Sequence, residues 1–114
     1  MRVIVCGGRH YKDAMALNAA LDRFHAQHAI SCVIQGGASG ADRLAYMWAA
    51  MRGIIVHNVP ADWKKHGKAA GPIRNQQMID LFWPAALIAF PGGRGTADMI
   101  QRAKAAELPV YRPS

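Results

Sequence analysis

The sequence has few acidic residues and no long apolar run, and both shortages exclude classes of protein. It holds 14 lysine and arginine residues against 7 aspartate and glutamate residues, a net charge of +7 that favours an anionic partner. No apolar stretch reaches the ~18 residues that a membrane span needs, and no signal-peptide pattern opens the chain. We therefore expect a cytoplasmic protein without a membrane partner. Hydrophobic residues make up 52%, which is typical of a folded domain.

Cysteines are also scarce, and only Cys6 and Cys32 occur. One interpretation is a disulfide or a redox pair, and the other is two buried free thiols. Because both cysteines lie in apolar runs, we favour free thiols. The histidines show no spacing typical of metal ligands, so we predict no metal and no required cofactor.

Short β-branched runs alternate with helical patterns along the chain. The predicted strands are 2–6, 30–35, 54–59, 86–90 and 109–112, and the predicted helices are 13–28, 40–52, 72–82 and 96–106. Such alternation predicts a mostly parallel sheet of about five strands, covered on both faces. We expect residues 1–114 to form one α/β domain, a three-layer sandwich. Its core is expected to include Leu44, Tyr46, Met47, Trp48, Met51 and Trp83.

Four loops follow the first four predicted strands. They collect most of the glycine and, together with Arg43 and Arg74 just inside the following helices, most of the positive charge. They are 7–13, 36–42, 60–71 and 91–98. Ligands of open α/β folds bind beyond the carboxyl ends of the strands. The free N–H groups at the start of a helix can bind a phosphate group. Glycine beside them has no side chain, so the phosphate can come close to the backbone. Tight strand-to-helix turns are the alternative explanation for these glycines. Neither GxGxxG nor GxxxxGK[ST] occurs, so backbone and helix ends would hold the phosphate.

We assign candidate contacts to these loops and the helices after them. The candidates for nucleotide or phosphate binding are Gly7, Gly8, Arg9, Gly36, Gly37, Ser39, Gly40, Asp42, Lys68, Arg74, Asn75, Pro91, Gly92, Gly93, Arg94, Gly95 and Thr96. Trp63 is the candidate for stacking on a base, with Tyr11 the other aromatic expected at this edge.

Several candidates also have purely structural interpretations. Trp63 could anchor the loop as an apolar side chain, and Arg9 could pair with Asp13. Thr96 could cap the last helix. Asp42 could act as a favourable charge at a helix start. His10 and His66 have no carboxylate at a spacing that would indicate acid–base chemistry.

Four motifs in order carry a resemblance to a known family. VIVCGGRHYKD, VIQGGASGADRLA, ADWKKHGKAAGPIRNQQM and ALIAFPGGRGTADM resemble the YspA-like, YpsA-related branch of the SLOG superfamily. That superfamily is similar to the Smf/DprA and LOG proteins, and the resemblance covers nearly the whole chain. It implies a Rossmann-like fold with a nucleotide-type ligand at the glycine loops. Members include phosphoribohydrolases and domains thought to sense nucleotides or NAD-derived signals.

One departure from the family pattern bears on catalysis. The LOG enzymes carry PGGxGTxxE with a catalytic glutamate, and the matching position here is Met99. Asp98 lies one residue earlier, about 100° around the helix. Asp98 and Asp42 are the remaining candidates for a catalytic carboxylate. Whether the chain is an enzyme stays open, and we favour binding over catalysis.

Three functions are consistent with these patterns. The first is binding of a nucleotide, a nucleotide-sugar or an NAD-derived ligand of the ADP-ribose type, as a sensor, carrier or sequestering module. Its output would pass through a partner, a homo-oligomer or sequestration itself. The second is phosphoribohydrolase-like cleavage of an N-glycosidic bond. Single-stranded nucleic-acid binding ranks third, because few aromatics lie at the predicted edge.

Overall fold

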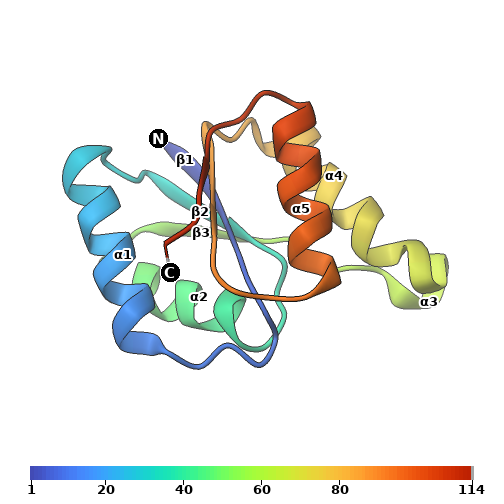
Figure 1. The fold of residues 1–114 in the computed structure, drawn as a ribbon, viewed down its shortest axis with the longest axis horizontal. Helices are drawn as coiled ribbons and strands as arrows, with labels where there is room; N and C mark the ends of the chain where they lie inside the picture. Colours follow the sequence, from blue (N-terminus) through green and yellow to red (C-terminus); the bar gives the residue numbers. More distant parts are fainter. Residues whose placement is uncertain (114) are drawn as a thin grey trace.

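A five-stranded parallel sheet with helices on both faces makes up the computed structural model, which describes residues 1–113 (Figure 1). The strands are β1 Arg2–Cys6, β2 Cys32–Gln35, β3 Ile55–Asn58, β4 Ala86–Ala89 and β5 Val110–Tyr111, in the order β3-β2-β1-β4-β5. The helices are α1 Ala14–Gln27, α2 Ala41–Met51, α3 Trp63–His66, α4 Ala70–Phe82 and α5 Arg94–Ala105, with a 3-10 turn η1 at Gly67–Ala69. The predicted α/β sandwich is confirmed.

The central strands are apolar on both faces because both faces are covered. Successive side chains of a strand point to opposite sides of the sheet. Val3 and Val5 pack in the layer of α1 and α2, whereas Ile4 and Cys6 pack in the layer of α4 and α5. Figure 1 shows these helix pairs on opposite sides of the strands. The sequence pattern of continuous apolar runs follows from this burial.

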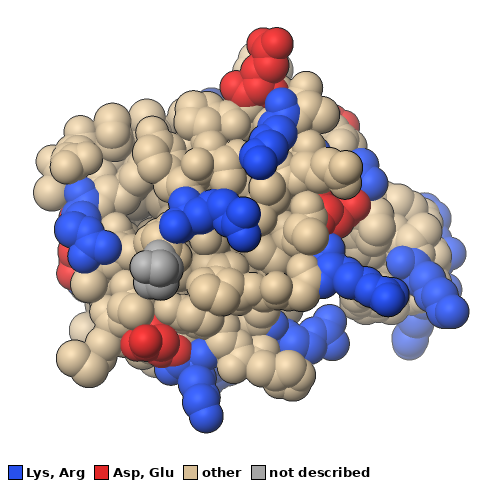
Figure 2. All heavy atoms as spheres, in the orientation of Figure 1, with Lys and Arg blue, Asp and Glu red and all other residues tan. Residues whose placement is uncertain are grey.

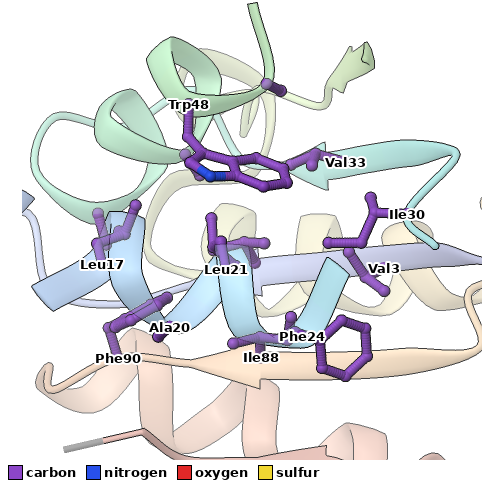
Figure 3. Packing of buried hydrophobic residues seen from close by; sticks show 14 of the residues in the cluster. Val3, Leu17, Ala20, Leu21, Phe24, Ile30, Val33, Trp48, Ile88 and Phe90 are labelled. Atoms are coloured by element: carbon purple, nitrogen blue, oxygen red, sulfur yellow. The ribbon is translucent and has the colours of Figure 1, made fainter. Parts of the chain in front are cut away.

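Trp48 is the centre of the α1–α2 layer, where it lies over Leu21 and beside Val33 (Figure 3). Its ring nitrogen donates a 2.9 Å hydrogen bond to Asp22 of α1. Arg52 pairs with the same carboxylate oxygen at 2.6 Å and lies 4.6 Å from the centre of the Trp48 ring. This cluster ties α1 to α2 through both apolar and charged contacts.

The structure exposes several residues of α2 and one at the end of α4 that the sequence predicts to be in the core. Trp48 is buried and Leu44 is half-buried, but Tyr46, Met47 and Met51 are exposed, Met51 by 82%. Trp83 is 77% exposed, because α4 ends there in a left-handed turn with φ 52°. The buried face of α2 is instead formed by Trp48 with small residues, namely Ala41, Ala45 and Ala49. Small side chains let this helix lie close to the sheet.

Both cysteines are buried free thiols, which confirms the favoured interpretation. Cys32 pairs in register with Arg2, and Cys6 lies four residues further along β1. Four residues of strand span about 13 Å. This separation is far beyond the ~7 Å that a disulfide allows between Cα atoms.

The expected loop 60–71 is largely helical. Asp62 caps α3 by accepting a hydrogen bond from the N–H of Lys65 at 3.1 Å. The chain continues through η1 into α4, which begins two residues before Pro72, and α3 projects at one side of the molecule (Figure 1). Within residues 1–113, no helix combines the length and hydropathy needed to cross a bilayer.

Candidate functional site

The strand order reverses between β1 and β4, and the loops after these two strands lead to opposite faces of the sheet. The loop after β1 leads to α1, and the loop after β4 leads to α5. Such a reversal leaves a crevice at the carboxyl edge of the sheet. A cleft of about 630 Å³ lies here, a volume within the usual range for small-molecule sites.

Most of the candidate contact residues meet in this cleft. Those that line it are Gly7, Gly8, Arg9, Gly36, Asp42, Arg74, Asn75, Pro91, Gly92, Gly93, Arg94, Gly95 and Thr96. Those outside its lining are Gly37, Ser39, Gly40, Trp63 and Lys68. Four further residues line the cleft although the sequence did not mark them as candidate contacts, namely Val5, Cys6, Ala38 and Met78. These four looked like ordinary core or turn residues, and only the strand order places them at the cleft.

Main-chain hydrogen bonds join three of the glycine loops to one another. The N–H of Gly8 donates to the Pro91 carbonyl at 2.9 Å, and the Gly8 carbonyl accepts from the N–H of Ala41 at 3.1 Å. Gly40 has φ +76°, and a side chain there would meet the Gly8 carbonyl. Ser39 donates from its hydroxyl to the Arg9 carbonyl at 3.0 Å. Ser39 and Gly40 thus support the loops instead of lining the cleft.

The glycines of the cleft fall into two groups. Gly7, Gly36 and Gly92 have no room for a Cβ atom; at Gly92 it would lie 2.6 Å from the Gly8 nitrogen. Gly93 and Gly95 have no such neighbour within 4 Å. Packing within residues 1–113 therefore explains the first group and leaves Gly93 and Gly95 unexplained.

Helix α5 begins directly at the cleft. Within residues 1–113 no side chain caps its start, and its first helical hydrogen bond runs from the N–H of Ala97 to the Gly93 carbonyl at 3.0 Å. The preceding N–H groups, of Arg94, Gly95 and Thr96, are the donors that a helix start leaves free. They carry the positive end of the helix dipole, which attracts anions.

Arg74 and Asp42 flank Gly36 at the inner wall. Arg74 donates to the Gly36 carbonyl at 2.8 Å, and the Asp42 carboxylate accepts from the N–H of Ala38 at 3.2 Å. Burial lowers the pKa of Arg74. Burial also raises the pKa of Asp42, although backbone donors and the charge of Arg74 oppose this. Both side chains line the cleft while holding the end of β2 in place.

The carboxylate of Asp98 lies outside the cleft lining. It accepts hydrogen bonds from Asn75 at 2.9 Å and from Arg102 at 2.8 Å. Burial raises its pKa, but these two donors outweigh burial and hold the pKa below its usual value. Met99 is 1% exposed and packs in the apolar layer with Ile4 and Leu87. Asp42 is thus the one acidic side chain that lines the cleft among residues 1–113.

The lysines near α3 also lie away from the cleft. Figure 2 shows a group of positive side chains where α3 projects, and that segment carries Lys64, Lys65 and Lys68. Trp63 is 54% exposed and lies beside Gly71. The aromatic ring at the cleft is that of Tyr11, whose centre lies 5.5 Å from the Phe90 ring.

Positive charge at the cleft comes from Arg9, Arg74 and Arg94, with His10 beside them. Residues 1–113 contain no group of three His, Cys, Asp or Glu side chains placed to hold a metal ion. The site is therefore a cationic, glycine-walled cleft whose lining also includes the apolar residues Val5, Ala38 and Met78. Its chemistry suits an anion attached to a partly apolar group.

Comparisons with known proteins identify a family, a relative and a similar fold. The model of the YspA, cpYpsA-related SLOG family matches residues 1–66. The Gene 61 protein of Mycobacterium phage D29 is 38% identical over 117 residues, covering 96% of this chain and 93% of that protein. The crystal structure of Acinetobacter baumannii MurG superposes with a TM-score of 0.62 at 14% identity, over 97% of this chain. This chain spans 34% of that MurG chain, and the likeness concerns the fold.

Proposed function

The chain belongs to the YspA, cpYpsA-related SLOG family, and we propose that it binds a nucleotide, a nucleotide-sugar or an NAD-derived ligand of the ADP-ribose type in this cleft. It would act as a sensor, carrier or sequestering module. The observation that carries the proposal is the uncapped start of α5, which faces the cleft across Gly93 and Gly95. Packing needs neither glycine, and the open space beside both supports close approach of a ligand to the backbone.

A phosphoryl group is the chemical group that this cradle suits best. The free N–H groups of the first turn donate to it, and the helix dipole adds to the attraction. Arg9 and Arg94 are both exposed at the cleft, and their guanidinium groups are free to close on phosphate oxygens. Tyr11, which also lines the cleft, offers the base an aromatic ring to stack on.

Cleavage of an N-glycosidic bond is the second candidate, and the position of Asp42 at the cleft is what favours it. A carboxylate there could stabilise the positive charge that develops on a ribosyl ring. Against this, Asp42 is engaged by the N–H of Ala38, and its raised pKa disfavours the charged form. Binding without cleavage therefore remains the proposal.

A thermal-shift panel tests the proposal, with AMP, ADP-ribose, NAD, UDP-glucose and a short single-stranded DNA at moderate salt. A ligand at 100 times its dissociation constant adds about 2.7 kcal/mol of stability, a rise in Tm of roughly ten degrees for a domain of this size. Chromatography of the ligand afterwards distinguishes binding from cleavage. Intact nucleotide supports the proposal, and free base with ribose phosphate supports the enzyme.

A charge-matched pair of variants locates the binding site. Arg94→Glu is expected to weaken nucleotide binding at least tenfold, because it places a negative charge at the cradle. Arg23→Glu makes the same charge change on α1, outside the cleft, and is expected to alter affinity less than twofold. Absence of any nucleotide shift would contradict the proposal. Affinity that grows with DNA length and falls steeply with salt would support nucleic-acid binding instead.

A further inference from the structure

A second cavity of about 240 Å³ adjoins the cleft on the other side of the start of α5. Gly92, Gly93 and Thr96 line both cavities. The remaining wall of the second cavity runs along α5 and the end of the sheet, and consists of Phe90, Ala97, Ile100, Gln101, Lys104 and Arg112. We name this cavity the α5 groove. The shared residues make the cleft and the groove neighbours across a single stretch of backbone.

The charge of the α5 groove is positive and unbalanced. Its charged residues are Lys104 and Arg112, and no Asp or Glu among residues 1–113 lines it. The two ion pairs found within residues 1–113 involve other arginines, Arg52 and Arg102. Lys104 and Arg112 are both exposed, and Figure 2 shows positive side chains on the face formed by α5 and the end of the chain. An anion entering the groove would therefore meet two cations that no carboxylate of residues 1–113 neutralises.

Both cations are placed toward the shared backbone. Ile88 of β4 pairs in register with Tyr111, so Arg112 lies at the carboxyl edge of the sheet, as does the loop after β4. Lys104 follows Thr96 by eight residues, about 12 Å along the helix axis. Long side chains of a helix lean toward its N-terminus. Lys104 and Thr96 both line the groove, so a Lys104 side chain that follows this tendency would extend along it toward Thr96.

Thr96 and Gly93 form the wall between the two cavities. Thr96 is only 8% exposed, and its hydroxyl lies against Gly92, because a Cβ atom at Gly92 would meet the Thr96 oxygen. Gly93, by contrast, has open space where a Cβ atom would stand. A bare stretch of backbone therefore lies where the cleft meets the groove.

We infer that the α5 groove is a subsite for a second phosphoryl group of the ligand, held by Lys104 and Arg112. The ligand is then a nucleoside diphosphate or a nucleotide linked through a diphosphate, and not a nucleoside monophosphate. Its first phosphoryl group lies at the start of α5 in the cleft, and the chain of phosphates crosses the backbone at Gly93. This inference rests on the proposed function and narrows its ligand class.

Isothermal titration with AMP, ADP and ADP-ribose at one fixed ionic strength tests the inference. The wild-type protein is expected to bind ADP and ADP-ribose at least tenfold more tightly than AMP. The double variant Lys104→Gln/Arg112→Gln should reduce this ratio to about twofold or less, with AMP affinity changed less than twofold. The double variant Arg23→Gln/Lys65→Gln removes the same charge outside both cavities and should keep the ratio.

The outcomes separate this inference from the proposed function. Wild-type binding of AMP with no preference for ADP or ADP-ribose would overturn the inference and leave the proposed function standing. An equal loss of the ratio in the control double variant would also overturn it, since net charge alone would then explain the preference. If no nucleotide binds to the wild-type protein, the proposed function fails and the inference fails with it. All four substituted side chains are exposed, so every variant is expected to fold.

Discussion

Asn75 donates a 2.9 Å hydrogen bond to the Asp98 carboxylate across the contact between α4 and α5. Arg102 donates to the same oxygen from one turn further along α5. Asp98 adjoins Met99, the position that matches the glutamate of the LOG enzymes, and its carboxylate is therefore occupied in holding two helices together. Asp98 thus joins α4 to α5, and its neighbour Met99 packs in the apolar core.

Asp98→Asn is expected to lower the free energy of unfolding at pH 7 by about 1 kcal/mol, because a partly exposed ion pair is lost. The pKa of Asp98 is lower in the folded protein than its usual value. Its contribution is therefore complete above pH ~4 and is lost as the pH falls through the folded value. Urea unfolding of both proteins at pH 7 and pH 3 measures this. If the difference in unfolding free energy between the two proteins were larger at pH 3 than at pH 7, the lowered pKa of Asp98 would be contradicted.

Asp42→Asn should show the opposite pH dependence. Burial raises the pKa of Asp42 in the folded protein, so its ionised form is disfavoured relative to the unfolded chain. The wild-type protein then loses stability relative to the variant as the pH rises from below 4 through the folded value of Asp42. Unfolding free energies of both proteins between pH 3 and pH 8 test the sign. The prediction is wrong if the unfolding free energy of the variant falls relative to that of the wild-type protein as the pH rises.

Substitutions at Gly40 and Gly93 distinguish a glycine that the fold needs from a glycine that we propose the ligand needs. Gly40→Ala is expected to cost about 1–3 kcal/mol of stability, because φ is +76° and the new methyl group meets the Gly8 carbonyl. Gly93→Ala should change stability by no more than about 0.5 kcal/mol, since open space surrounds it. The same methyl group should nevertheless weaken ADP-ribose binding about tenfold by covering the start of α5. Unfolding curves and titrations of both variants measure the contrast. Unchanged affinity in Gly93→Ala would remove the reason we give for that glycine.

Introducing the glutamate of the LOG enzymes at position 99 should not confer cleavage of AMP. Met99 is enclosed in the apolar layer, so Met99→Glu buries a carboxylate without a partner and is expected to cost more than about 3 kcal/mol at pH 7. Met99→Leu keeps the volume and should cost less than about 1.5 kcal/mol. Denaturation and chromatography of AMP after incubation are the measurements. A stable Met99→Glu variant that releases adenine would show that this side chain reaches the cleft.

Aromatic contact with a base is expected from Tyr11 and not from Trp63. Tyr11→Leu should weaken ADP-ribose binding about tenfold, in the range of a stacking contact of ~1–3 kcal/mol, and leave inorganic phosphate binding unchanged. Trp63→Leu should have no effect on either, because Trp63 lies outside the cleft. Titration of both variants with both ligands decides between the two rings. If only Trp63→Leu weakens ADP-ribose binding, α3 belongs to the binding site.

Much of the fold and most of the cleft follow from local sequence signals. The strand pattern gives the parallel sheet, and the rule for carboxyl edges brings Arg9, Gly36 and Arg94 together although they are distant along the chain. The pattern could not tell which glycines serve packing. At Gly7 and Gly36 the reason is a neighbour from another loop or helix, Ala41 and Arg74, and sequence spacing does not reveal such contacts.

The structure departs from the sequence analysis in two places. The sequence pattern predicts a polar loop over 60–71, with Trp63 and Lys68 among the candidate contacts, but neither residue lines the cleft. Local capping by Asp62 instead starts a short helix that carries these residues away. Met51 and Trp83 were expected inside because they are apolar. Burial depends on which part of a helix meets the sheet, and alanines occupy that face of α2.

The hydrogen bonds that join the glycine loops have a consequence for redesign of the cleft. They connect main-chain atoms, from Gly8 to Pro91 and from Ala41 to Gly8. The exposed side chains of His10 and Arg94 at the rim take no part in these hydrogen bonds. Replacement of either side chain should therefore alter the charge and shape of the rim while the backbone beneath keeps its geometry.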